Sequence, residues 1–292
     1  RLHKAFGRFI DVREQSDAEV AQLLRSLEVD IAVDLKGYTQ DCRTGILVRR
    51  CAPVQVNYLG FLGTMGAPYI DYIVGDATVT PPGCERFYTE HIVRLPHSYQ
   101  VNDRQRAVAP TTPSRAEAGL PEQGFVFCCF NNNYKISPAV FAVWMRLLQR
   151  ISGSVLWLLQ DNADAAAHLR ASAEAAGVDP ARLVLAPRVP MPEHLARQRL
   201  ADLFLDTLPC NAHTTTSDAL WVGLPVLTCL GESFPGRVAA SLLRAAGLPE
   251  LVTTSLADYE ALAITLATTP GMLADLRTRL ERGRLVCPLF DT

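Results

Sequence analysis

The chain has 292 residues, of which 49% are hydrophobic and 20% charged, and its formal net charge at pH 7 is -2. This length predicts two domains of about 100–200 residues each. The longest apolar runs fall far short of the roughly 20 residues that a membrane helix needs, and no signal peptide opens the chain, so we expect a cytoplasmic protein without a membrane partner. No basic block interleaved with aromatic residues occurs, which argues against general nucleic-acid binding.

The eight cysteines are scattered along the chain. They form neither a repeated C-x-x-C nor a Cys/His spacing typical of zinc ligands. In a chain of this size the pattern predicts buried thiols rather than a disulfide framework or a metal site.

Short apolar runs alternate with helical patterns, which is typical of α/β layers built on parallel strands. The predicted strands are residues 31–35, 54–58, 72–75, 125–130, 155–159, 183–186, 203–205 and 226–228. A helix is expected after Ser137-Pro138, a cap and a favoured first-turn proline, with apolar residues at three- and four-residue steps up to Ile151. Further helices are predicted over 165–176, 192–201, 237–246 and 257–266.

Residues 102–123 are rich in Pro, Ala, Thr and charge and give the weakest packing signal. We therefore predict an N-terminal α/β domain over 1–110, a linker over 111–123 and a Rossmann-type domain over 124–292. The first domain offers only a few strands, so we expect its beginning to be missing.

Two loops after predicted strands carry polar residues, and ligands of doubly wound sheets bind at the carboxyl ends of strands. After strand 125–130, Lys135 can neutralise a diphosphate while Asn132 donates hydrogen bonds. After strand 183–186, His194 can stack on a nucleobase and Arg197, one turn later, can reach base edges. The alternatives are a solvated polar loop and a structural histidine.

A third loop reads Cys210-Asn211-Ala212-His213-Thr214-Thr215-Thr216 and leads into a helix that carries Asp218. We expect the threonines to cap this helix, whose first N–H groups and positive dipole end suit a phosphate. An ordinary capped helix is the alternative. Together the three loops predict a nucleotide-diphosphate pocket, with His194 at the base, Asp218 near the ribose, and Lys135, His213, Thr214 and Thr215 around the phosphates.

Glycines in the N-terminal part allow close backbone approach to a ligand, in Gly37-Tyr38-Thr39 and in Leu59-Gly60-Phe61-Leu62-Gly63. Structural turns explain them nearly as well. The chain contains no G-x-x-x-x-G-K-[ST] and no G-x-G-x-x-G, which argues against a P-loop NTPase and a dehydrogenase.

At these positions the sequence resembles the catalytic region of the O-linked N-acetylglucosamine transferase family, and more closely its bacterial members. The resemblance covers nearly the whole chain. The matching motifs are Phe130-Asn131-Asn132-Asn133-Tyr134-Lys135-Ile136, Ser154-Val155-Leu156-Trp157-Leu158-Leu159, Cys210-Asn211-Ala212-His213-Thr214-Thr215 with Asp218, Gly231-Glu232-Ser233-Phe234, Arg237-Val238-Ala239-Ala240-Ser241 and Pro288-Leu289-Phe290.

The resemblance implies an α/β GT-B glycosyltransferase, with two Rossmann-like domains facing across a cleft and the N-terminal one truncated. It implies inverting transfer of N-acetylglucosamine from UDP-GlcNAc to Ser or Thr hydroxyls of an acceptor protein or peptide, without a metal or other cofactor. The family's catalytic histidine motif and tetratricopeptide repeats would lie upstream of this chain, which is therefore expected to be a fragment.

The resemblance also implies residue roles. Lys135 and His213 would be catalytic, because they would stabilise the leaving UDP together with the helix start. The nucleotide would be bound by Asn132, Lys135, His194, Arg197, His213, Thr214, Thr215 and Asp218, and the sugar would lie near Thr39, Leu59, Gly60 and Cys210. Animal members have a glutamine at Asn132, a lysine at Met191 and a proline at Leu62. Two alternatives stay open: a related transferase using UDP-glucose or GDP-fucose, and a non-catalytic sugar-nucleotide-binding protein.

Overall fold

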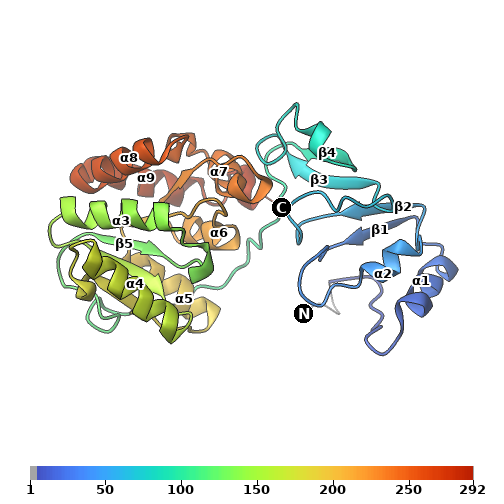
Figure 1. Ribbon diagram of the computed structural model, residues 1–292, viewed down its shortest axis with the longest axis horizontal. Coiled ribbons are helices and arrows are strands. Elements are labelled where there is room, and N and C mark those ends of the chain that lie inside the picture. Colours follow the sequence, from blue (N-terminus) through green and yellow to red (C-terminus); the bar gives the residue numbers. More distant parts are fainter. Residues whose placement is uncertain (1–4, 292) are drawn as a thin grey trace. The chain divides into compact units, whose positions relative to one another are not determined.

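The computed structural model describes residues 5–291, which divide into two compact units (Figure 1). Unit 1 comprises Arg1–Gly75 and Thr80–Leu95, and unit 2 comprises Asp76–Val79 and Pro96–Thr292. The segment 111–123, predicted as a linker, belongs to unit 2. No helix of the described part of the chain is both long and apolar enough to cross a membrane.

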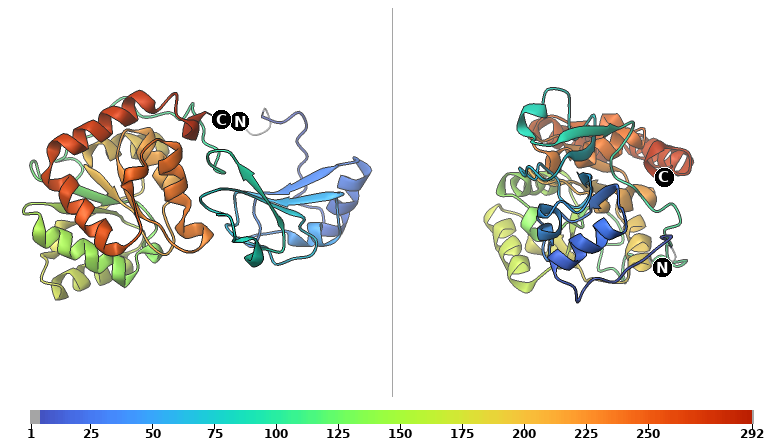
Figure 2. Two further views of the ribbon diagram at one scale, coloured as in Figure 1. Left: turned by 90° about the horizontal axis from the view of Figure 1, so that it is seen from above. Right: turned by 90° about the vertical axis from the view of Figure 1, so that its right-hand side faces the viewer.

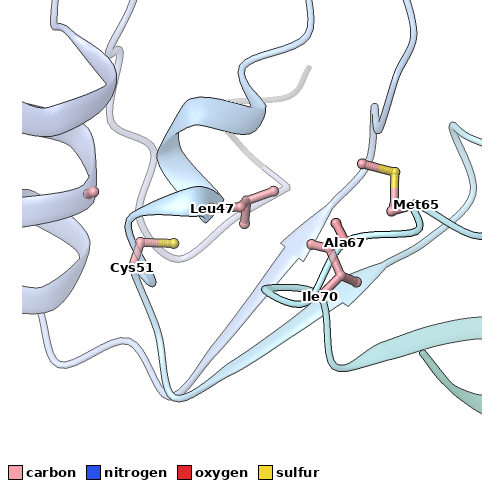
Figure 3. Packing of buried hydrophobic residues seen from close by; sticks show 6 residues of the cluster. Leu47, Cys51, Met65, Ala67 and Ile70 are labelled. Atoms are coloured by element: carbon pink, nitrogen blue, oxygen red, sulfur yellow. The ribbon is translucent and has the colours of Figure 1, made fainter. Parts of the chain in front are cut away.

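Unit 1 is built on a four-stranded sheet in the order β1-β2-β3-β4, in which β1 pairs parallel with β2 and β2 with β3. Its strands are β1 (Ile31–Asp34), β2 (Val54–Asn57), β3 (Tyr72–Asp76) and β4 (His91–Leu95), and its helices are α1 (Asp17–Ser26), α2 (Thr44–Val48) and the short 3-10 helix η2 (Glu85–Phe87). Residues from both α-helices, from the loop between α2 and β2 and from the loop before β3 form its hydrophobic core, as Figure 3 shows: Ala21, Leu47, Cys51, Met65, Ala67 and Ile70.

Unit 2 is built on a six-stranded sheet in the order β10-β9-β8-β5-β6-β7, with every pair parallel. The strands are β5 (Val126–Cys129), β6 (Val155–Leu159), β7 (Leu183–Ala186), β8 (Leu203–Leu205), β9 (Val226–Cys229) and β10 (Val252–Thr253). Every residue of β5, β6, β8 and β9 is buried. Such continuous burial is typical of a parallel sheet that helices cover on both faces.

Helices lie on both sides of this sheet (Figures 1 and 2). They are α3 (Pro138–Arg150), α4 (Ala163–Ala175), α5 (Met191–Arg197), α6 (Thr214–Trp221), α7 (Val238–Ala245), α8 (Leu256–Thr268) and α9 (Pro270–Gly283), with 3-10 helices η3 (Asn133–Lys135), η4 (Pro180–Arg182), η5 (Gln198–Leu200), η6 (Phe234–Gly236), η7 (Pro249–Leu251) and η8 (Pro288–Phe290). Ser137 caps α3 by accepting a hydrogen bond from the Val140 N–H, as the sequence predicts.

The strand order places a topological switch point between β5 and β8. The chain runs outward from β5 through β6 to β7 and then returns to the other side of β5 with β8, β9 and β10. At such a point the loops after the two central strands separate and leave room for a ligand at their carboxyl ends. The loops after β5 and β8 are the ones that carry Asn132, Lys135 and His213.

Candidate functional site

A cavity of about 380 Å³ lies in unit 2 at the carboxyl ends of the central strands. Its lining includes most of the predicted nucleotide-binding residues, namely Asn132, His194, Arg197, Thr214, Thr215 and Asp218, together with Phe130, Leu159, Arg188, Val189 and Met191. Lys135 and His213 are outside this lining but belong to the same two loops. The structure thus brings together residues from three separate loops of the sequence.

The loops after β5 and β8 are joined directly by side chains. Asn131, only 2% exposed, donates its amide to Thr207 Oγ1 at 2.8 Å and accepts the Thr215 hydroxyl at 2.6 Å. The Lys135 ammonium donates to the Asn211 carbonyl at 2.7 Å. These bonds fix the lysine beside the start of α6, where its charge adds to the positive end of the helix.

The start of α6 differs from the sequence prediction. His213 is the N-cap residue and no side chain caps the helix, so the prediction that the threonines act as caps is wrong. Instead Thr215 bonds to Asn131, and the Thr216 hydroxyl donates back to the Ala212 carbonyl at 3.1 Å. Among the hydrogen bonds of the described residues, none uses the backbone N–H of Thr214 or Thr215. An anion bound at the start of a helix accepts hydrogen bonds from such N–H groups.

The His213 ring is neutral at pH 7, because burial and the nearby Lys135 charge lower its pKa to about 4. Its Nε2 lies 3.2 Å from the Pro235 carbonyl oxygen, which can only accept, so Nε2 carries the proton. In this state the free nitrogen of the ring is Nδ1, an acceptor. Lys135 is therefore the cation of this pair.

Asp206 holds the loop between β8 and α6 in place by hydrogen bonds. Its carboxylate is 2% exposed and accepts the backbone N–H groups of Thr207 and Ala212, at 2.7 and 2.6 Å, and the Thr228 hydroxyl at 2.6 Å. Burial raises its pKa to about 7 in spite of these bonds. The Asp206 carboxylate thus fixes the conformation of the loop that ends at His213.

His194 and Arg197 form a compact pair on α5. The Arg197 guanidinium donates to His194 Nδ1 from Nε at 3.1 Å and to the Pro187 carbonyl at 2.6 Å, and it stacks over the Phe130 ring at 5.3 Å. The His194 ring meets Phe130 edge to face, with centroids 5.0 Å apart. Burial, followed by Arg197 and Arg188, lowers the pKa of His194 to about 4, so the ring is a neutral, fixed surface. Such a surface can stack against a nucleobase.

Asn132 and Asp218 each have an arginine partner that sequence reasoning did not assign. Asn132 Oδ1 accepts from Arg188 at 3.2 Å, and Arg188 also donates to Asp161 at 2.8 Å. Asp218, 5% exposed, forms an ion pair with Arg106. Arg188 follows Pro187 in the loop after β7, so its charge next to a predicted site loop could have identified it from the sequence. Arg106 lies 112 residues before Asp218, and no local pattern relates the two.

The predicted sugar-binding residues are divided between the units. In unit 1, Leu59 and Gly60 follow β2, and a Cβ on Gly60 would come within 2.0 Å of the Leu35 carbonyl oxygen, so only glycine fits there. Thr39 follows β1, and its backbone carbonyl accepts the Cys42 N–H at 3.2 Å. In unit 2, Cys210 has a half-buried free thiol, and its backbone carbonyl accepts a hydrogen bond from the Thr207 hydroxyl at 2.7 Å.

Comparison with known proteins adds independent information. The sequence pattern of Glycosyl transferase family 41 matches residues 1–112 and 105–292. The Arabidopsis thaliana protein named "Probable UDP-N-acetylglucosamine--peptide N-acetylglucosaminyltransferase SEC" is 40% identical over 298 residues, which cover 100% of this chain and 30% of that protein. A Caenorhabditis elegans UDP-N-acetylglucosamine–peptide N-acetylglucosaminyltransferase is 27% identical, over 97% of this chain and 34% of that protein. The chain spans about a third of the length of these relatives.

Solved structures point to the same family as the sequence comparisons. The Thermobaculum terrenum O-GlcNAc transferase mutant K341M superposes with a TM-score of 0.88 at 35% identity, covering 97% of this chain and 54% of that one. The Anabaena HepE protein, solved with UDP and glucose, superposes with a TM-score of 0.63 at 13% identity, which shows a shared fold alone. Both units of the α/β architecture therefore have GT-B-like structural neighbours. The chain belongs to glycosyl transferase family 41, the O-GlcNAc transferase family, and corresponds to its catalytic region.

Proposed function

We propose that this chain is a cytoplasmic catalytic region that transfers N-acetylglucosamine from UDP-GlcNAc to Ser or Thr hydroxyls of an acceptor protein, with inversion at the anomeric carbon. The observation that carries the proposal is the cavity at the β5/β8 switch point, lined by Asn132, His194, Arg197, Thr214, Thr215 and Asp218. Family membership supports the choice of donor, since the relatives named above are N-acetylglucosaminyltransferases.

In the proposed reaction, negative charge develops on the leaving diphosphate, next to the hydrogen-bond donors at the start of α6. As the acceptor hydroxyl oxygen attacks the anomeric carbon and passes its proton to a general base, the bond to the diphosphate oxygen breaks and UDP leaves with additional negative charge. The Lys135 ammonium and the open N–H groups of Thr214 and Thr215 stabilise that charge. His213 completes this diphosphate site, His194 stacks on the uracil, and Cys210 contacts the sugar.

The test is a transfer assay with labelled donors. Purified protein, as this chain and with any natural upstream segment attached, is incubated with a Ser/Thr peptide and UDP-GlcNAc, UDP-glucose or GDP-fucose. The proposal predicts label on the peptide from UDP-GlcNAc in at least one form, lost in Lys135→Ala. Transfer from GDP-fucose or UDP-glucose instead would assign another donor, and donor binding without any transfer would favour a sugar-nucleotide-binding protein.

A further inference from the structure

The segment that precedes the helices of unit 2 is attached along α6, the helix whose start forms the proposed phosphate site. Gln100, 5% exposed, donates its amide to the Ser217 hydroxyl at 2.8 Å. The Trp221 indole N–H donates to the Arg106 carbonyl at 3.2 Å. Arg106 then returns its guanidinium to Asp218. Contacts to three helix residues over little more than one turn make residues 100–106 a strap on α6.

Of the contacts between this strap and α6, the Arg106–Asp218 ion pair is the one that involves a residue lining the proposed nucleotide cavity. Its side chains are only 18% and 7% exposed, which distinguishes it from the solvent-exposed pairs that contribute little. Among the described residues, Arg106 is the one hydrogen-bonding partner of the Asp218 carboxylate, and it uses Oδ1. Asp218 also lines the nucleotide cavity. Its second oxygen, Oδ2, therefore remains for a ligand hydroxyl.

We propose that Arg106 is a positioning residue of the nucleotide site: it holds the Asp218 carboxylate ionised and oriented so that Oδ2 accepts a ribose hydroxyl of the bound UDP. The inference rests on the proposed function, in which Asp218 contacts the ribose. Arg106 itself stays on the protein side of the carboxylate. A buried carboxylate without this partner would carry an uncompensated charge, which is costly inside a protein.

The charged groups around Asp218 show why its ionised state depends on Arg106. Burial raises the pKa of Asp218, and Arg106 opposes this shift. The other ionisable groups that line the same cavity are Arg188, His194 and Arg197. Arg188 is engaged with Asp161 and Asn132, Arg197 with His194 and Pro187, and His194 is neutral at pH 7. Without Arg106, the pKa of Asp218 would rise further.

The experiment measures UDP binding by calorimetry to the 292-residue chain between pH 5.5 and 8.5, a range of about three units chosen to span protonation of a buried carboxyl. Arg106→Gln should weaken UDP about tenfold at pH 7, and Arg106→Lys, which keeps the charge, by less than about threefold. The loss in Arg106→Gln should deepen as pH falls, because a protonated Asp218 accepts the hydroxyl poorly, and should shrink as pH rises. Arg104→Gln is the matched control, since Arg104 lies two residues earlier and pairs with exposed Asp291.

Two further measurements separate positioning from folding. On an Asp218→Asn background, Arg106→Gln should have no additional effect, and 2′,3′-dideoxy-UDP should bind wild type and Arg106→Gln equally. Equal UDP affinity of wild type and Arg106→Gln across the pH range would overturn the inference, and so would an equal loss for the dideoxy nucleotide. Failure of the wild type to bind UDP at all would instead overturn the proposed function.

Discussion

Both histidines of the candidate site are neutral at pH 7, since burial lowers the pKa of His194 and of His213 to about 4. The positive charge beside the start of α6 therefore comes from Lys135 and from the helix itself. His194 provides a flat ring held by Arg197, and His213 provides a ring tied to the Pro235 carbonyl. The two histidines thus contribute shape and hydrogen bonding rather than charge.

Lys135→Ala removes this charge and should weaken UDP binding by about 1–3 kcal/mol, the cost of losing a charged hydrogen bond. Calorimetric titration of UDP measures the loss. Arg150→Ala, at the exposed far end of α3, removes a positive charge away from the β5 loop and should leave the affinity unchanged. Equal affinities of Lys135→Ala and wild type would contradict the diphosphate assignment of this loop.

At the residue scale, sequence reasoning identified side chains in the loops after strands and in the first turns of the helices that follow them. Asn132, His194 and Thr214 could be predicted because parallel strands deliver their following loops to one edge of the sheet. Arg106 could not, because it reaches Asp218 across 112 residues through the path of the strap. The threonine caps were predicted wrongly, since a Thr-rich helix start has the composition of a cap whether or not its hydroxyls turn back to the helix.

At the scale of elements, the fully buried strands of unit 2 were predicted well, whereas β4, β10, α1, α2 and α9 were missed. The apolar runs of β5, β6 and β9 lie where the sequence places strands, because a strand covered on both faces must be apolar throughout. β10 has only two residues and therefore no strong pattern. α9 was missed although its buried Leu273, Leu276 and Leu280 recur at helical spacing. α1 was also missed, although Ser16 and Glu19 form a capping box that announces it.

The loop between β8 and α6 depends on one buried carboxylate. Asp206→Ala leaves the N–H groups of Thr207 and Ala212 and the Thr228 hydroxyl without their acceptor, so we expect a loss of about 2–5 kcal/mol in the free energy of unfolding. Urea denaturation at pH 7 measures it. Asp164→Ala, exposed in the first turn of α4, should cost less than about 1 kcal/mol. Comparable losses in both variants would show that the loop does not need Asp206.

The same carboxylate gives the stability of the protein a defined pH dependence. Its pKa is about 7 in the folded state and about 3.9 in an unfolded chain, so the folded state binds the proton more tightly. The stabilisation from this group is therefore fully present below about pH 4 and is lost as pH rises through about 7. Relative to Asp206→Asn, the wild type should lose stability over that window. A difference between the two that is constant with pH would contradict this assignment.

On the scale of the whole molecule, the chain has two sheets, of four and six strands, and the proposed nucleotide site lies in the unit with the larger sheet. The missing glycine fingerprint is consistent with this arrangement, because the phosphates are proposed to meet α6, after β8, rather than the first strand–helix turn of a dinucleotide-binding fold. The residues of the proposed nucleotide site thus all belong to unit 2.

The most direct test is a calorimetric titration of the 292-residue chain with UDP, GDP and NAD in one buffer, with Asp218→Asn beside the wild type. We predict selective binding of UDP, the nucleotide of the proposed donor, and a weaker affinity in Asp218→Asn, because Asp218 lines the cavity and is proposed to accept a ribose hydroxyl. Preference for GDP would point to a fucosyl donor. Binding of NAD, or equal UDP affinity in both proteins, would contradict the assignment of this cavity as a UDP site.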